Sequence, residues 1–294
     1  MNSKMKRIND WKITSAGLFL VHLISFTACQ EDGEMINSSA DEAEAIALDE
    51  SIIDDLFEDI DLLSDEASEY ESDNQGGRLE NTESAMMGDC VGRGMERTRA
   101  DGILTKTVTL DFQEGCEGPN GRERQGTMIV TRITDTNAST YTVSTTFQDF
   151  FLDGKKVEGT RTRVYARAEA GAQQVQITLT EGKVTTEDGR VIERSGSFTK
   201  VRDRNSGETT MQGSASGINR NGVSYTSTIT EPLMYKRSCF SEGVYIAVAG
   251  VRSITREGKP DVAVNYGAGE CDKTVDVTVN GETRSLEMTI TKKD

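Results

Sequence analysis

The sequence predicts an all-β protein: a long-stranded antiparallel up-and-down meander, forming a curved sheet, a sandwich or a barrel, with one N-terminal acidic amphipathic helix packed on it. Three observations lead to this prediction. The composition, with 35% hydrophobic residues and 28 glycines, is too apolar for a disordered chain and too lean for a helical bundle. Turn dipeptides recur at regular intervals, and the segments between them alternate apolar and polar residues.

Residues 1–28 read as a secretory signal peptide. Positive charges gather in residues 1–12, and the uncharged stretch 13–28 that follows is shorter than the roughly 20 residues of a membrane span. The stretch ends in Thr27 and Ala28, directly before Cys29. This resembles a bacterial lipobox, in which the cysteine is acylated and becomes the first residue of the mature chain. We therefore expect Cys29 to carry a lipid, palmitate included, that anchors the protein to a membrane.

One residue departs from the usual lipobox, because Phe26 stands where leucine is common. The alternative is an ordinary signal peptide with a chance cysteine near its end. The acidic residues after Cys29 resemble the surface-export signal of Bacteroidota lipoproteins. That resemblance implies the cell outer membrane as the location, with the protein exposed at the surface.

Removal of residues 1–28 takes away Trp11 and His22, the single tryptophan and the single histidine of the chain. A mature chain without histidine has no Ser-His-Asp or Cys-His catalytic arrangement and no histidine-based zinc site. The sequence therefore predicts that the protein is not an enzyme and uses no cofactor.

The formal net charge of −16 is concentrated in one segment. Residues 30–89 hold 21 acids and one base, whereas residues 90–294 hold 27 acids and 28 bases. Nucleic acid is excluded as a partner because phosphate binding needs clustered positive charge. We divide the chain into the signal peptide 1–28, an acidic tether 29–89 and a single antiparallel β domain 90–294.

Within the tether, apolar residues spaced three and four apart predict an amphipathic helix over about 41–64. Residues 30–40 and 71–89 are rich in Ser, Asn, Gly and Glu and are interpreted as linker. No stretch of acids has the order of an EF-hand loop. A run of charges is usually a solvated face or a tether, and the acids are interpreted as such.

From residue 103 onward, turns recur about every 17 residues in two alternating series, as in a meander with one series at each end of the sheet. Strands of about 10 to 14 residues follow from this spacing. The first series consists of the dipeptides Asn120-Gly121, Asp153-Gly154, Asp188-Gly189, Asn221-Gly222 and the weaker Glu257-Gly258. The second lies near residues 136–139, 170–172, 205–207 and 241–243.

The strands alternate as half-buried strands do, and the two sets of side chains are expected on opposite faces. The apolar face is assigned to Val175, Ile177 and Leu179, to Thr127, Ile129 and Ile133, and to Tyr141, Val143 and Phe147. Thr, Ser and Arg are expected on the other face. The apolar face needs a cover, and we expect the acidic helix to supply it through Ile52, Leu56, Phe57 and Ile60.

Four cysteines follow Cys29, and an even number in a secreted chain predicts two disulfides. Three pairings are possible. The pairing of Cys90 with Cys116 and of Cys239 with Cys271 is preferred, because both intervals end in an alternating strand, a glycine-containing turn and a cysteine. The alternative is four free buried thiols.

Several strings together resemble a group of Bacteroidota outer-membrane and surface lipoproteins with repeated cysteine-containing strand motifs. The strings are DFQEGC, FQDFFLDGKKVEGTRTR, GSASGINRNGVSYTSTITEPL and VNYGAGECDKTVDVTVNG, and the resemblance covers most of residues 90–290. It implies lipid attachment and no particular activity.

Three further groups of residues are candidate sites. An exposed aromatic platform is one interpretation of Phe147, Phe150 and Phe151, although core positions are favoured. An anion site is one interpretation of Lys155, Arg161, Arg163 and Arg167, although pairing with acids on a wet face is favoured. A glycosidase pair is one interpretation of Asp149 and Asp153, and it is the weakest of the three.

Two functions from different classes follow from the sequence. The first is a non-enzymatic surface lipoprotein that binds an envelope protein or a glycan, or has a structural role in the cell envelope. The alternative is a carrier that encloses an apolar, lipid-like ligand between the curved sheet and the helix. A carboxylate-based hydrolase is the third choice.

Overall fold

The computed structural model describes residues 32–70, 86–138, 140–166, 172–203 and 205–288. Backbone structure is described from Asp32, and side chains from Ala40. A long helix α1 (Asp32–Glu69) precedes the strands, and a short helix α2 (Arg237–Phe240) interrupts them. The strands are β1 (Gly92–Ala100), β2 (Ile103–Asp111), β3 (Cys116–Glu117), β4 (Glu123–Asp135), β5 (Thr140–Leu152), β6 (Lys155–Ala166), β7 (Ala172–Thr185), β8 (Val191–Asp203), β9 (Glu208–Ile218), β10 (Ser224–Lys236), β11 (Ala249–Thr255), β12 (Val262–Ala268), β13 (Thr274–Val279) and β14 (Glu282–Glu287).

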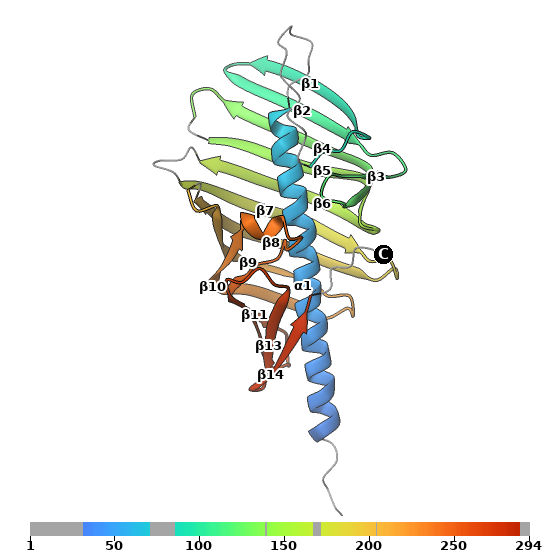
Figure 1. Cartoon of the computed structure of the whole chain (residues 1–294), viewed down its shortest axis with the longest axis vertical. Helices are drawn as coiled ribbons and strands as arrows, with labels where there is room; N and C mark the ends of the chain where they lie inside the picture. The colour runs from blue at the N-terminus through green and yellow to red at the C-terminus, as the bar shows by residue number, and fades with distance from the viewer. Residues whose placement is uncertain (1–31, 71–85, 139, 167–171, 204, 289–294) are drawn as a thin grey trace, which may run out of the picture.

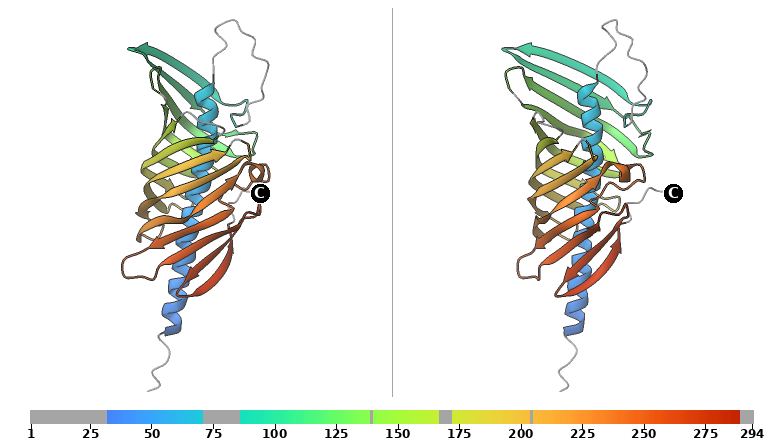
Figure 2. Two further views of the ribbon diagram at one scale, coloured as in Figure 1. Left: turned by 90° about the vertical axis from the view of Figure 1, so that its left-hand side faces the viewer. Right: turned by 60° about the vertical axis from the view of Figure 1, so that its left-hand side comes forward.

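All of these strands belong to one 14-stranded sheet in which neighbours along the chain are neighbours in space. The order runs from β1 to β14, the pairs are antiparallel, and only the two-residue β3 lies off this path, paired with β4. The sheet is curved and unclosed (Figures 1 and 2). The predicted all-β meander with one N-terminal helix is confirmed.

Helix α1 crosses the strands on the inner, concave side of the sheet (Figures 1 and 2). Its N-terminal end lies at the β14 end of the sheet and its C-terminal end near β2. The helix has 38 residues, a length of about 57 Å at 1.5 Å per residue. It begins nine residues before the predicted start at 41, so the interpretation of residues 32–40 as linker was wrong.

Tight turns join the strands at the predicted positions. Asp153-Gly154, Asp188-Gly189 and Asn221-Gly222 each connect two consecutive long strands. Two connections outside the predicted series have the same chemistry, Asp101-Gly102 between β1 and β2 and Asn280-Gly281 between β13 and β14. The four residues of these two connections have positive φ, which Asp, Asn and Gly tolerate best.

Several of the long strands contain a β-bulge, where the register shifts. Gly126 in β4 is one example, with φ of 76°, and a Cβ there would stand 1.9 Å from the Asp149 carbonyl oxygen. Asp149 and Glu181 adopt positive φ at two further bulges. A bulge bends its strand and strengthens the twist, so these positions shape the curvature of the sheet.

The two faces of the sheet were assigned correctly in β5 and β7. Val175, Ile177 and Leu179 are buried, and the residues between them are exposed. In β4 the assignment was wrong, because Met128 and Val130 face inward while Ile133 is 42% exposed on the outer face. Both faces of β4 carry apolar residues, so alternation alone could not decide which one α1 covers.

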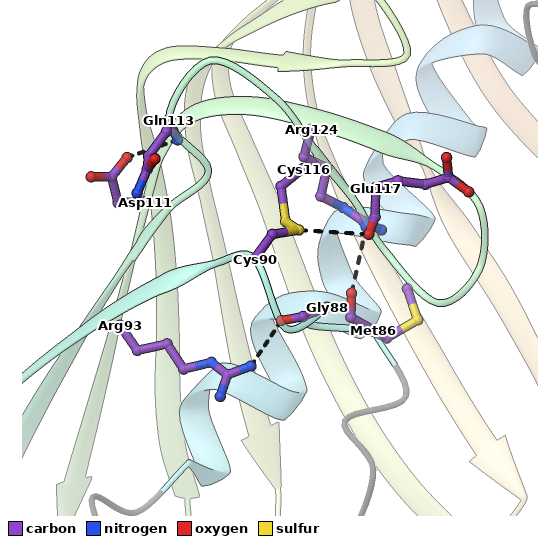
Figure 3. The surroundings of a disulfide bond; sticks show 9 residues. All are labelled: Met86, Gly88, Cys90, Arg93, Asp111, Gln113, Cys116, Glu117 and Arg124. Carbon is purple, nitrogen blue, oxygen red and sulfur yellow. Dashed lines mark hydrogen bonds between the residues drawn. A yellow bond between two sulfur atoms is a disulfide. The ribbon is translucent and has the colours of Figure 1, made fainter.

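Two disulfides join Cys90 to Cys116 and Cys239 to Cys271. This is the preferred pairing. The first bond ties the chain before β1 to β3 (Figure 3). Beside it, the Arg124 guanidinium donates to the Met86 carbonyl oxygen at 3.4 Å. The second bond ties α2 to the segment after β12.

Candidate functional site

The inner face of the sheet is basic as well as apolar, and α1 meets it with carboxylates. The expectation that arginine belongs to the outer, wet face was wrong, and so was the interpretation of the acids of α1 as a solvated run. The acids Asp49, Glu50, Asp55, Glu58, Asp59 and Asp61 are buried. Their basic partners on the sheet are Arg122, Arg124, Arg161, Arg163, Arg194, Lys200, Arg220 and Arg252.

Two of these pairs join α1 to the start of β4. Arg124 and Asp59 have fully buried side chains, and the Nη2–Oδ2 distance is 2.7 Å. Arg122 donates to Asp55 at 2.8 Å and to Asp153 at 2.8 Å, so it links the helix to the β5–β6 turn. Asp153 is one of the two carboxylates of the candidate glycosidase pair. In the structure it accepts a hydrogen bond from Arg122 and so helps to hold the turn to the helix.

A second cluster lies at the middle of the sheet. Arg252 and Arg194 share the carboxylates of Glu50 and Asp54, with distances from 2.5 to 3.5 Å. The Tyr225 hydroxyl also donates to Glu50, at 2.7 Å. Arg252 in β11 and Arg194 in β8 are thereby held to one stretch of helix, which fixes the curvature between those strands.

The third cluster explains two of the arginines of the candidate anion site. Arg161 donates to Asp61 through Nε and Nη2, at 2.6 and 2.7 Å. Arg163 donates to Asp65 at 2.7 Å. In the structure, the anionic groups that these two arginines bind are therefore carboxylates of α1. Lys155 lies beside Asp153, and Arg167 is outside the described residues.

Burial and ion pairing act in opposite directions on the carboxylates of α1. Burial raises the pKa of Asp54, but the charges of Arg252 and Arg194 outweigh it and bring the pKa to about 2. Burial raises the pKa of Asp55 to about 6, because it exceeds the opposing effect of Arg122. Adjacent residues of one helix therefore respond to pH in opposite senses.

Between the ion pairs, apolar side chains fill the contact. The four residues predicted to dock, Ile52, Leu56, Phe57 and Ile60, are each at most 7% exposed. The Arg161 guanidinium also lies 5.0 Å from the Phe57 ring centroid. The cavity between this part of α1 and the sheet has a volume of only about 20 Å³.

The aromatic platform and the carboxylate pair are not assembled as sites. Phe150 is fully buried and stacks on Phe147, with ring centroids 5.3 Å apart, so both belong to the core, as favoured; Phe151 is half-buried. Asp149 is exposed and pairs with Lys156 at 2.9 Å. Cys29 is outside the described residues.

A hollow of about 560 Å³ lies beside the C-terminal part of α1. Its lining combines Asp65, Glu66 and Glu69 of the helix with Arg202 and Arg237 of the sheet side. The Tyr141 and Tyr165 rings, stacked with centroids 4.6 Å apart, also line it. So many charged groups make it a poor site for an apolar ligand.

The outer face of the sheet differs sharply from the inner one. One row of hydroxyl side chains crosses nine strands, each residue paired directly with the next. Its members are Thr107, Thr131, Ser144, Thr162, Thr178, Ser197, Ser214, Thr228 and Ser253. Adjacent strands are about 4.8 Å apart, so the row forms a regular array of hydroxyls.

A larger hollow, of about 1110 Å³, opens on this outer face over β6–β11. A second hydroxyl row crosses it, formed by Ser195, Ser216, Thr226 and Thr255, which are cross-strand neighbours. Exposed carboxylates also line it, those of Glu181, Glu193 and Glu257 among them. Basic residues line it too, namely Lys183 and the buried Arg194 and Arg256. The sequence does not reveal this hollow, because the rows form only when the register of the strands is known.

No group of three or more potential ligands capable of holding a metal ion occurs among the described residues. Within the same residues, neither helix combines the length and the apolar character needed to cross a membrane. No protein-family model, curated protein or solved structure matches this chain.

Proposed function

We propose that the protein is a non-enzymatic binding or structural module of the bacterial cell envelope, anchored to the outer membrane by a lipid on Cys29. The sequence of residues 1–32 supports the anchor, through the signal-like stretch and the lipobox-like residues before Cys29. A mature chain without histidine has no histidine general base, and this supports a role other than catalysis.

The observation that carries this proposal is the filled groove of the sheet. A carrier of an apolar ligand needs an apolar cavity of about 300 to 1,000 Å³. Here α1 occupies the concave face with apolar side chains and ion pairs, and about 20 Å³ remains beneath its middle. The interior thus argues against the carrier and leaves the outer surface as the part available to a partner.

The position of α1 also suggests how the protein stands on the membrane. The helix begins at Asp32, three residues after Cys29, and its N-terminal end lies at the β14 end of the sheet. A lipid on Cys29 would therefore hold β14 near the membrane and β1 away from it. The helix would act as a strut along the stack of strands.

The anchor is tested by labelling cells with an alkyne analogue of palmitate. We expect labelling of the full chain and none of the Cys29→Ser variant, which should also leave the membrane fraction. A Cys29→Ser variant that is still labelled and still membrane-bound would contradict the proposal. Protease treatment of intact cells then determines which side of the outer membrane the β domain faces.

The binding role is tested by cross-linking in intact envelopes and identification of what is recovered with the wild-type chain. We expect a partner that is recovered again when the experiment is repeated with Asp149→Asn, a variant of an exposed carboxylate outside both hollows. Extraction of the purified protein with organic solvent tests the carrier alternative. A stoichiometric lipid beyond the acyl chains on Cys29 would favour the carrier and contradict our proposal.

A further inference from the structure

Over β4 to β9, the outer face of the sheet is free of charge across its middle. The outward positions of β4 to β9 in this region carry mainly Thr, Ser, Gln, Ile and Val, as in the alternating runs 127–133, 174–180 and 195–201. In β10, by contrast, Glu231 is exposed near the middle of the strand. An uncharged middle over β4 to β9 is unusual in a chain of which 28% is charged. The charges of the sheet are instead gathered on the inner face, against α1, and at the ends of the strands.

Such a face matches a particular kind of partner. An uncharged surface without a large apolar patch gives little attraction to a charged polymer or to a lipid surface. Each Ser or Thr hydroxyl can both donate and accept a hydrogen bond. Threonine is also stiff at χ1, so its hydroxyl is held in place before binding. A neutral chain of sugars presents the complementary pattern, since its hydroxyls donate and accept along an extended polymer.

We propose that the hollow over β6–β11 binds a neutral saccharide chain, which continues from there over the uncharged middle of β4 to β9. This inference rests on the proposed role as a binding module and names the class of its partner. The row of Ser195, Ser216, Thr226 and Thr255 lines the site and supplies its hydroxyl groups.

The carboxylates of the hollow add the second element of the site. Glu193 follows the β7–β8 turn by a few residues and pairs across the strands with Lys183 and Ile218, and it is exposed. The bulge in β7 brings Glu181 to the hydroxyl row, where its backbone N–H donates to the Ser195 hydroxyl oxygen at 3.0 Å. A carboxylate accepts strong hydrogen bonds from hydroxyl donors, so these groups orient sugar hydroxyls at the end of the row.

The test is native electrophoresis of the full chain in gels that contain a polysaccharide, with a polyoxyethylene detergent so that no sugar-based detergent competes. The probes are the neutral polymers mannan, dextran and xyloglucan, with polygalacturonate as the acidic contrast. We expect at least one neutral polymer to retard the wild-type protein and polygalacturonate not to do so.

The double variant Thr226→Val with Thr255→Val removes two hydroxyls while keeping the β-branched shape. We expect its association constant to fall at least tenfold, and Glu193→Gln to lower it severalfold. The matched control is Thr105→Val with Thr109→Val, on the outer face of β2 away from the hollow. It should bind within twofold of the wild type, and thermal unfolding should confirm that both double variants are folded.

Three results would overturn the inference: retardation by none of the neutral polymers, unchanged binding by the folded Thr226→Val, Thr255→Val variant, or preferential binding of polygalacturonate. Sedimentation velocity adds a fourth, because a dimer that this variant dissociates would make the face a protein interface. If no saccharide binds while cross-linking still recovers an envelope partner, this inference fails and the proposed function stands.

Discussion

Arg124 in β4 and Asp59 in α1 are joined by hydrogen bonds of 2.7 and 2.9 Å, although both side chains are completely buried and the residues are 65 positions apart. Removal of such charges from water costs several kcal/mol for each ion, so the pair is tolerated only because its geometry is good and its neighbours add hydrogen bonds. Asn120 supplies one of these, donating to Asp59 at 2.7 Å.

A double-mutant cycle on this pair separates the cost of a lone charge from the value of the pair. We expect Arg124→Met alone to destabilise the protein by about 3 to 5 kcal/mol, because Asp59 is left charged and buried. Arg124→Met combined with Asp59→Leu should be much less damaging. Urea unfolding followed by circular dichroism measures all four proteins. A double variant as unstable as the sum of the two single ones would show that the two residues do not interact.

Asp54 and Asp55 provide a matched pair for pH dependence. The pKa of Asp54 is about 2 in the folded protein, below its ordinary value of 3.8. Its contribution to stability is therefore complete above about pH 4 and is lost as the pH falls toward 2. We expect Asp54→Asn to have a lower free energy of unfolding than the wild type at pH 7. Between pH 4 and pH 2, the free energy of unfolding of the variant should fall by about 2 kcal/mol less than that of the wild type.

The stability contributed by Asp55 changes with pH in the opposite direction, because its pKa of about 6 lies above the ordinary value. Its ionisation costs stability, so the wild type loses on the order of 2 kcal/mol as the pH rises from 4 through 6. Asp55→Asn should remove that decline. The free energy of unfolding of both variants between pH 2 and pH 8 checks these slopes. Equal slopes in the two variants would contradict the assignment.

Deletion of residues 41–64 should prevent cooperative folding of the β domain. The deletion exposes the apolar inner face and leaves buried basic groups such as Arg124 and Arg252 without their carboxylates. We expect the heat-capacity peak of unfolding to disappear in calorimetry. Deletion of the C-terminal residues 289–294 serves as the control. A β domain of unchanged stability without the helix would contradict the docking described above.

The two disulfides should each stabilise the protein by about 2 to 4 kcal/mol. Peptide mapping without reduction should recover Cys90 linked to Cys116 and Cys239 linked to Cys271. Replacement of both cysteines of one pair by serine should lower the midpoint of thermal unfolding and leave the other pair intact. Recovery of any other linkage would contradict the pairing.

Much of the fold is local and could be predicted directly. A turn such as Asp188-Gly189 depends on the backbone preferences of its own residues, and the regular spacing of such turns predicts the meander. The alternation in β7 identifies its buried side because one set of residues is apolar and the other is not. The stripe of Ile52, Leu56 and Ile60 likewise marks the side of α1 that packs.

Relationships between distant segments could not be predicted in this way. Arg161 resembles a solvated strand residue, because nothing near it in the sequence shows that Asp61, 100 positions earlier, is its partner. The acids of α1 resemble a solvated tether for the same reason. The outer hydroxyl rows depend on register, which bulges shift by one residue at a time. The sequence therefore determines which segments form strands and helix, whereas long-range pairing decides which charges are buried and which surface is offered to a partner.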